Sequence, residues 1–296
     1  MIKSPRPSPT ASPLLFEIDP EPLSETLTAW GGASLAVQAF RSLGLPASIQ
    51  RQVHIKQRER GYDEATMVES FVVLNALGGE CLEDFSHLRG DGGLKEMLEH
   101  EIPSPEAARQ FLYQFHAVEK IEEAKQRREA EQIAFIPEEN EALAGLGEVN
   151  RELVQELGKR CPEQRIATVD QDATIIESHK EQALRSYEGE RGYQPMLAVW
   201  AEMDVVLTDE FRDGNVPAMM APLTVAKRAF AALPHTVQTY YFRGDSACHE
   251  SNLVDWLRDE QRGDGPQGSI GFAISARMSE ALHQASVTMP ALSSTF

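Results

Sequence analysis

Two segments of the sequence end an apolar run with an aspartate, the pattern of a strand that carries a carboxylate to the rim of a sheet. The first, residues 166–176 (IATVDQDATII), contains Asp172, and the second, residues 240–248 (YYFRGDSAC), contains Asp245. A carboxylate in such a position stays ionised only when water or a partner stabilises its charge. Mg²⁺ prefers a couple of carboxylates together with waters and phosphate oxygens. If the two rims are adjacent, the pattern predicts that Asp172 and Asp245 bind a divalent metal and catalyse phosphoryl chemistry.

Two further residues belong to the set of candidates. Asp170 has the same strand parity as Asp172, so both side chains can face the same side of a sheet. A lone aspartate at a strand end usually accepts hydrogen bonds from its own turn. Here a second aspartate occurs in the RGDS segment at 243–246, which favours a functional role for the aspartates of the first segment. Arg243 can form an ion pair with a carboxylate or bind a phosphate group. We rank Asp170 below Asp172 as a catalytic residue. We also rank Arg243 as a phosphate-binding residue below Asp245 as a metal ligand.

The order of the predicted elements indicates how these residues could meet. Apolar β-like runs alternate with helical patterns after residue 165, with strands expected at 166–176, 196–201, 205–211, 237–242 and 270–275, and helices at 221–233 and 250–261. Such an order predicts a mixed α/β sheet whose later crossovers are parallel and right-handed. The first strand and the strand after the first helix can then be neighbours, which would bring Asp172 close to Asp245.

The first half of the chain has a helical pattern. Asp63 is a typical N-cap residue, and Ser104 followed by Pro105 and Glu106 is a typical helix start. We therefore predict a disordered, Ser- and Pro-rich arm at residues 1–22 and an all-helical domain at 23–118. The Glu-rich residues 119–164 predict a charged helical connector or a solvated helical pair, broken at Pro137. A solvent-exposed helix face is favoured there over a partner-binding one.

Composition limits the functional classes. The net charge of −18 argues against a chain coated in a basic nucleic-acid surface, although many of the acids lie in 119–163. The three cysteines form no CxxC pair, so neither a disulfide framework nor a zinc cluster is expected. No apolar stretch of about 18 residues and no signal-like leader occurs, which predicts a cytoplasmic protein without a membrane span.

Several segments resemble bacterial insertion-sequence DDE transposases. In order, they are VDQDATIIES, GYQPMLAVW, DEFRDGN, YYFRGDSACHESNLVDWL and IGFAISAR, and PSPEAARQFL resembles the region that precedes the catalytic domain in that family. The resemblance covers most of the chain from about residue 26 to 285, within the uncertainty of element boundaries. It implies an all-helical N-terminal domain followed by an RNase H-like mixed-sheet domain at 165–296, in the α/β class.

The resemblance also implies a site and its partners. Three acids of the family bind two Mg²⁺ ions for DNA strand cleavage and strand transfer, with element ends and target DNA as substrates, and a homo-oligomer is compatible with this. The first acid corresponds to Asp172, which precedes a small residue and a threonine, and the second to Asp245; Arg243 is the DNA-binding candidate. The third acid, a glutamate, has no matching position, and Glu280 lacks the family's flanking pattern. We therefore expect an incomplete catalytic domain, that is, a C-terminally truncated copy whose activity is in question.

Two other interpretations stay open at this point. Asp170, Asp172 and Thr174 after an apolar strand also resemble the opening motif of haloacid-dehalogenase-like phosphatases, which would make Asp170 a nucleophile. The chain could instead be a non-catalytic transposase remnant that binds DNA or inhibits a full-length copy. Incubation with labelled DNA would separate these interpretations. Cleavage would support a catalytic transposase, binding without cleavage would support a chain that only binds DNA, and neither outcome would support an inactive remnant.

Overall fold

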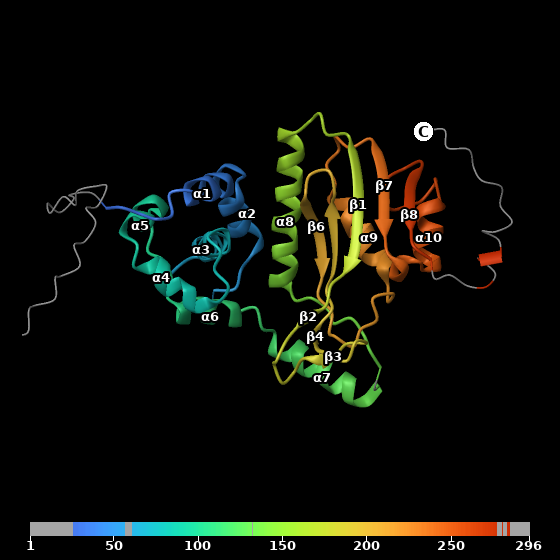
Figure 1. The fold of residues 1–296 in the computed structure, drawn as a ribbon, viewed down its shortest axis with the longest axis horizontal. Coiled ribbons are helices and arrows are strands. Elements are labelled where there is room, and N and C mark those ends of the chain that lie inside the picture. Colours follow the sequence, from blue (N-terminus) through green and yellow to red (C-terminus); the bar gives the residue numbers. More distant parts are fainter. Residues whose placement is uncertain (1–25, 57–60, 132, 277–279, 281–282, 285–296) are drawn as a thin grey trace, which may run out of the picture.

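A computed structural model describes residues 26–56, 61–131, 133–276, 280 and 283–284. The predicted arm at 1–22 lies outside the described residues. A bundle of short helices forms one part of the molecule, a sheet with its helices forms the other, and helix α8 stands between them (Figure 1). In the described part of the chain, no helix is long and apolar enough to cross a membrane.

The bundle consists of short helices around one apolar core. Its elements are α1 (Ala33–Ser42), α2 (Leu45–Gln52), α3 (Glu64–Ala76), the 3₁₀ turn η1 (Leu82–Asp84), α4 (Phe85–Arg89), α5 (Gly92–Leu98) and α6 (Pro105–Tyr113). The predicted caps are confirmed, because Asp63 accepts a hydrogen bond from the Thr66 N–H at 2.7 Å and Ser104 accepts one from the Ala107 N–H at 3.1 Å. Such caps each contribute about 1 kcal/mol to helix stability.

Two helices follow the bundle, α7 (Val118–Glu131) and α8 (Glu141–Arg160). No residue of α7 is buried, as expected of a solvated helix. The same expectation is wrong for α8, which buries Val149 in the core of the bundle and Val154 in the core of the sheet. Its glycines allow this close packing, since a Cβ on Gly145 would meet the Gln52 carbonyl oxygen at 2.1 Å. The Glu-rich composition concealed a helix with two buried faces.

The large sheet has five strands in the order β6-β5-β1-β7-β8. Its strands are β1 (Ile166–Ala173), β5 (Met196–Trp200), β6 (Val205–Glu210), β7 (Thr239–Gly244) and β8 (Ile270–Ile274), and helices α9 (Pro222–Ala232) and α10 (Ser251–Arg258) form the crossovers. Strand β5 runs antiparallel to both of its neighbours, β6 and β1, whereas β1, β7 and β8 are parallel. The predicted α/β class and the predicted neighbours β1 and β7 are confirmed.

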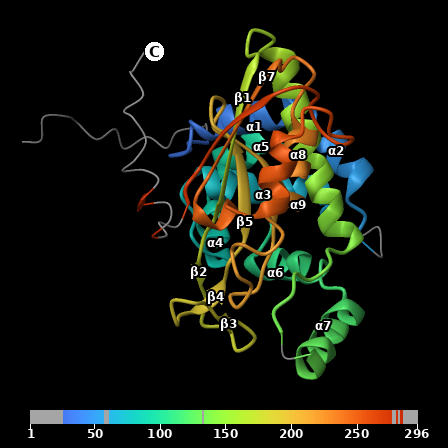
Figure 2. The ribbon, with the colours of Figure 1, turned by 90° about the vertical axis from the view of Figure 1, so that its right-hand side faces the viewer.

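The two faces of this sheet differ. Ala167 and Val169 of β1 are buried against α9 and α10, which lie on one side of the sheet (Figure 2). Residues of opposite parity point to the other face, where Ile166 is 45% exposed and Tyr241 of β7 is 44% exposed. Because side chains alternate along a strand, Asp170 and Asp172 also belong to this exposed face.

A second, small sheet was not predicted. It has the order β2-β4-β3 and consists of β2 (Ile176–Glu177), β3 (Leu184–Arg185) and β4 (Arg191–Tyr193), beyond the carboxyl end of β1 (Figure 1). The run expected as one strand, 166–176, is divided after Ala173, and the Thr174 N–H donates to the Pro195 carbonyl at 3.0 Å. Strands of two or three residues are too short to give a periodic sequence signal.

Candidate active site

The structure brings Asp172 and Asp245 together. Gln171 of β1 lies opposite Gly244 of the parallel strand β7, and each aspartate is the next residue along its own strand direction. The carboxyl ends of parallel neighbours meet at the same edge of a sheet, so both carboxylates lie at one edge. Residues far apart in the sequence thus form one acidic pair, which from here on means Asp172 and Asp245.

Short local hydrogen bonds orient the acidic pair. Asp172 accepts a hydrogen bond through Oδ1 from the N–H of Ala173 at 2.8 Å. Asp245 accepts one through Oδ1 from the N–H of Ala247 at 2.8 Å and so caps the 3₁₀ turn η2 (Ser246–Cys248). Both residues are exposed to solvent. Two exposed carboxylates, each held by one oxygen, are a donor set that suits a hydrated Mg²⁺ ion.

The charges of the acidic pair act on two neighbouring groups. Burial raises the pKa of the Cys248 thiol to about 12, and the charges of Asp245 and Asp172 add to this effect. The pKa of the Tyr187 phenol is also raised, first by Glu188 and then by Asp245 and Asp172. A buried thiol and an exposed phenol thus both lie within the field of the same two carboxylates.

Within the described residues, no third acid joins the acidic pair. Among the described residues, no group of three or more His, Cys, Asp or Glu side chains is placed to hold a metal ion. Glu280 is described, and its Oε1 accepts a hydrogen bond from Gln284 at 3.2 Å rather than completing such a group. The residues present fit one cation held by two carboxylates.

Asp170 and Arg243 form an ion pair beside the acidic pair. They are register partners on β1 and β7, and Nη2 of Arg243 lies 2.5 Å from Oδ2 of Asp170. Their side chains are 39% and 58% exposed, respectively. The pairing raises the pKa of Arg243, which the hydrogen bond to Asp170 stabilises in its charged form. Asp170 therefore pairs with a charged side chain, whereas Asp172 accepts its hydrogen bond from the backbone N–H of Ala173.

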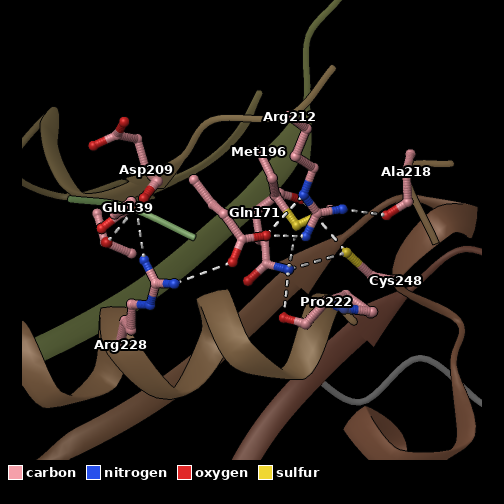
Figure 3. Close-up of polar contacts among 11 residues, drawn as sticks. Glu139, Gln171, Met196, Asp209, Arg212, Ala218, Pro222, Arg228 and Cys248 are labelled. Atoms are coloured by element: carbon pink, nitrogen blue, oxygen red, sulfur yellow. Dashed lines mark hydrogen bonds and ion pairs between the residues drawn. The ribbon is translucent and has the colours of Figure 1, made fainter. Parts of the chain in front are cut away.

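A buried polar layer surrounds Gln171, which directly precedes Asp172 in β1 (Figure 3). Gln171, fully buried between the two aspartates of β1, donates from Nε2 to the Pro222 carbonyl at 3.0 Å and to the Met196 sulfur at 3.1 Å. The Cys248 thiol lies 3.8 Å from the same nitrogen. The layer joins β1 to β5, to the start of α9 and to η2, which carries Asp245 at its N-cap. In the sequence Gln171 is a spacer in the DQD motif, and no signal marked it as a structural residue.

Next to this layer lies a buried ion-pair cluster. Glu210 is 5% exposed and contacts Arg212, which is fully buried, at 2.6 Å and Arg228 at 3.2 Å. Arg212 also donates from Nη1 to the Ala218 carbonyl at 3.3 Å. Its positive charge lowers the pKa of Cys248 slightly against the larger effects of burial and the acidic pair. Sequence reasoning assigned no role to these residues, although they tie β6, the edge strand beside β5, to α9.

Comparison with protein-family models gives a match. A family model described as transposase DDE domain group 1 matches residues 23–291, which is most of the chain. The comparison with curated proteins returns no match. The match covers both the helical bundle and the sheet with its acidic pair.

Proposed function

Because this chain belongs to the family described as transposase DDE domain group 1, we propose that it acts on DNA in transposition by metal-dependent strand cleavage and strand transfer. The observation that supports this most directly is the register of β1 and β7, which sets Asp172 beside Asp245 at one exposed edge. Two adjacent carboxylates suit the phosphoryl chemistry of this family.

Each residue of the pair has a defined task in this proposal. Asp172 and Asp245 hold Mg²⁺, and the backbone N–H groups of Ala173 and Ala247 orient the carboxylates through their Oδ1 atoms. When bound, the cation would stabilise charge on the phosphate and favour formation of the attacking hydroxide or alkoxide. Gln171 fixes β1 from behind, so the two strand ends keep their spacing.

Arg243 is the proposed DNA contact. Its guanidinium is more than half exposed, and Arg243 lies two residues before Asp245. Asp170 forms an exposed ion pair with the guanidinium and is not assigned a metal. A guanidinium can exchange such an exposed carboxylate for a phosphate at modest cost, because surface ion pairs are weak.

Metal-induced stabilisation tests the proposal. We expect Mg²⁺ to raise the melting temperature of the parent chain, and Asp172→Asn or Asp245→Asn to abolish that rise. Asp170→Asn is the matched control on the same strand and should retain most of it. Labelled DNA carrying the terminal repeats that flank the coding sequence should be cleaved only by the parent and by Asp170→Asn. An equal response to Mg²⁺ in all four proteins would refute the metal site.

The phosphatase interpretation has less support than the transposase one. The family match favours a transposase, and Asp170, its proposed nucleophile, is engaged by Arg243. The non-catalytic interpretation rests on a specific observation, namely that only two acids gather at the edge within the described residues. A shifted DNA band without cleavage, in the presence of Mg²⁺, would favour a chain that binds DNA without cutting it.

A further inference from the structure

One aromatic side chain stands out in the small sheet. Tyr187 is 76% exposed, more than any other large hydrophobic side chain in the described part of the chain. It lies in the connection between β3 and β4 of the small sheet. An isolated exposed tyrosine is common on protein surfaces, so its significance depends on how it is held and where it lies.

The backbone under Tyr187 is a closed turn. The N–H of Gly189 donates to the Ser186 carbonyl at 3.0 Å, and the N–H of Ser186 donates to the Glu190 carbonyl at 2.8 Å. Arg185 adds a hydrogen bond from Nη1 to the Gly189 carbonyl at 2.6 Å. Gly189 has a φ of +92°, a conformation that favours glycine. The turn therefore presents the ring from a fixed backbone, which lowers the entropic cost of a contact.

The small sheet is itself seated firmly on the rest of the domain. The N–H of Gly214 donates to the Gly192 carbonyl at 3.1 Å, and a Cβ on Gly214 would meet the Leu184 carbonyl oxygen at 2.5 Å. Tyr193 forms an isolated β-bridge with Asp213, whose carboxylate lies 2.5 Å from Arg128 of α7. Two close backbone approaches and an ion pair thus fix the hairpin that carries Tyr187.

The position of Tyr187 relates it to the acidic pair. Tyr187 belongs to the small sheet, which lies beyond the carboxyl end of β1, and this is the edge of the large sheet at which Asp172 and Asp245 lie (Figure 1). The charges of both aspartates also contribute to the raised pKa of its phenol. Glu188 adds a further negative charge next to it. In the absence of a bound cation these acids repel phosphate groups, whereas the face of a nucleobase is uncharged and stacks on an aromatic ring independently of the charge around it.

We propose that Tyr187 is a stacking platform for a nucleobase of the DNA strand whose phosphate lies at Asp172 and Asp245. This inference rests on the proposed function, because it needs a DNA strand at the acidic pair. Stacking supplies affinity that a chain of net charge −18 cannot draw from a basic surface. Base stacking tolerates any sequence, so Tyr187 positions the strand without selecting a base.

The test measures binding apart from cleavage. Parent and variants of the full chain are titrated into fluorescein-labelled single-stranded oligo-dT that contains one 2-aminopurine, in a buffer with Ca²⁺. We expect Tyr187→Ala to weaken binding about tenfold and Tyr187→Phe to bind like the parent, because a ring face is retained. Tyr113→Ala, which alters a tyrosine of the bundle that is 60% exposed, is the matched control and should leave affinity unchanged.

Two further readouts, one spectroscopic and one of salt dependence, separate stacking from a structural role of Tyr187. Quenching of 2-aminopurine fluorescence should be lost in Tyr187→Ala and kept in Tyr187→Phe. The slope of log affinity against log salt should be the same in the parent and in Tyr187→Ala, because stacking releases no counterions. A Tyr187→Ala chain that binds like the parent, or a Tyr187→Phe chain as weak as Tyr187→Ala, would overturn the inference.

The outcomes for Tyr187 and for the proposed function are distinguishable. Ring-dependent binding without cleavage of terminal-repeat DNA would support the stacking role and count against catalysis. If the parent cleaves this DNA but its affinity does not depend on the ring of Tyr187, the result would support catalysis and count against the stacking role. A parent that binds no DNA would overturn the stacking inference directly.

Discussion

The bundle and the sheet each bury one carboxylate between two cationic groups, and they do so differently. The bundle cluster is Glu69 with Arg41 and His100, and the sheet cluster is Glu210 with Arg212 and Arg228. The two carboxylates are similarly buried, with side chains that are 6% and 5% exposed. Their partners differ, because Arg41 is 36% exposed whereas Arg212 is fully buried.

The second difference is chemical. His100 is a group that titrates near neutral pH, whereas both partners of Glu210 are arginines that stay charged at all accessible pH values. The sheet cluster therefore keeps one charge state, and it lies beside the polar layer around Gln171 (Figure 3). The bundle cluster changes charge with pH. Within the chain, a permanent cluster supports the candidate active site and a titrating one supports the helical part.

The largest effect is expected from breaking the sheet cluster. Glu210→Gln leaves the charge of Arg212 buried without its counterion, and removing one member of a buried pair typically costs about 3–5 kcal/mol. The free energy of unfolding from urea titration measures this loss. Glu148→Gln is the matched control, since its pair with Arg151 is about half exposed and should contribute less than about 1 kcal/mol.

A smaller loss would alter the comparison. If Glu210→Gln cost no more than Glu148→Gln, Arg212 would have another route to compensation, such as its hydrogen bond to the Ala218 carbonyl. The distinction between a permanent and a titrating cluster would then no longer rest on burial of the charge.

The bundle cluster should make stability depend on pH. Both ring nitrogens of His100 face acceptors, Glu69 at 2.9 Å and the Glu101 carbonyl at 3.0 Å, so the ring binds best as the doubly protonated cation. The hydrogen bond to Glu69 raises the pKa of His100 above its ordinary 6.5. Burial alone would raise the pKa of Glu69, but hydrogen bonds from His100 and Arg41 lower it below its ordinary 4.5.

The signs of these shifts define a pH window. The His100 contribution is fully present below pH 6.5 and is lost as pH rises through the raised pKa. The Glu69 contribution is present above pH 4.5 and is lost as pH falls through the lowered pKa. We expect the free energy of unfolding to fall by about 1.5–3 kcal/mol on the alkaline side, the scale of a hydrogen bond to a charged group.

Urea titrations across this range check the pH prediction. His100→Gln should remove the alkaline loss, whereas His235→Gln, which alters an exposed histidine of the sheet part, should retain it. An alkaline loss of the same size in parent and His100→Gln would assign the pH dependence to other groups.

Much of the fold could be predicted because its signals are local. Asp63 and Ser104 cap helices through their own backbone neighbourhood, and the alternation in β1 follows from burial of one face. The small sheet escaped prediction because its pairing depends on contacts such as Gly192 against the Ile176 carbonyl, which are distant in the sequence. For α8, composition suggested solvation, whereas a few small and branched residues determine its packing.

The candidate site, too, could be predicted only in part. The order of strands and helices was sufficient to place Asp172 beside Asp245, because parallel neighbours align their carboxyl ends. Gln171 and Tyr187 were not found, since a buried glutamine resembles a spacer and an exposed tyrosine resembles any surface residue. The metal-binding roles themselves, and the division of the chain at residues 23–118, 119–164 and 165–296, stay predictions.

The smallest effect is expected from the exposed pair Asp170 and Arg243, which serves as a reference for both buried clusters. A double-mutant cycle with Asp170→Asn and Arg243→Gln should give a coupling free energy below about 1 kcal/mol, because water screens charges that are 39% and 58% exposed. The coupling should fall further in 1 M salt, where the screening length is about 3 Å. A coupling above about 2 kcal/mol would contradict this and would mean that Arg243 is fixed by Asp170. A weak pair instead leaves the guanidinium free to turn to a DNA phosphate at little cost, as its proposed role requires.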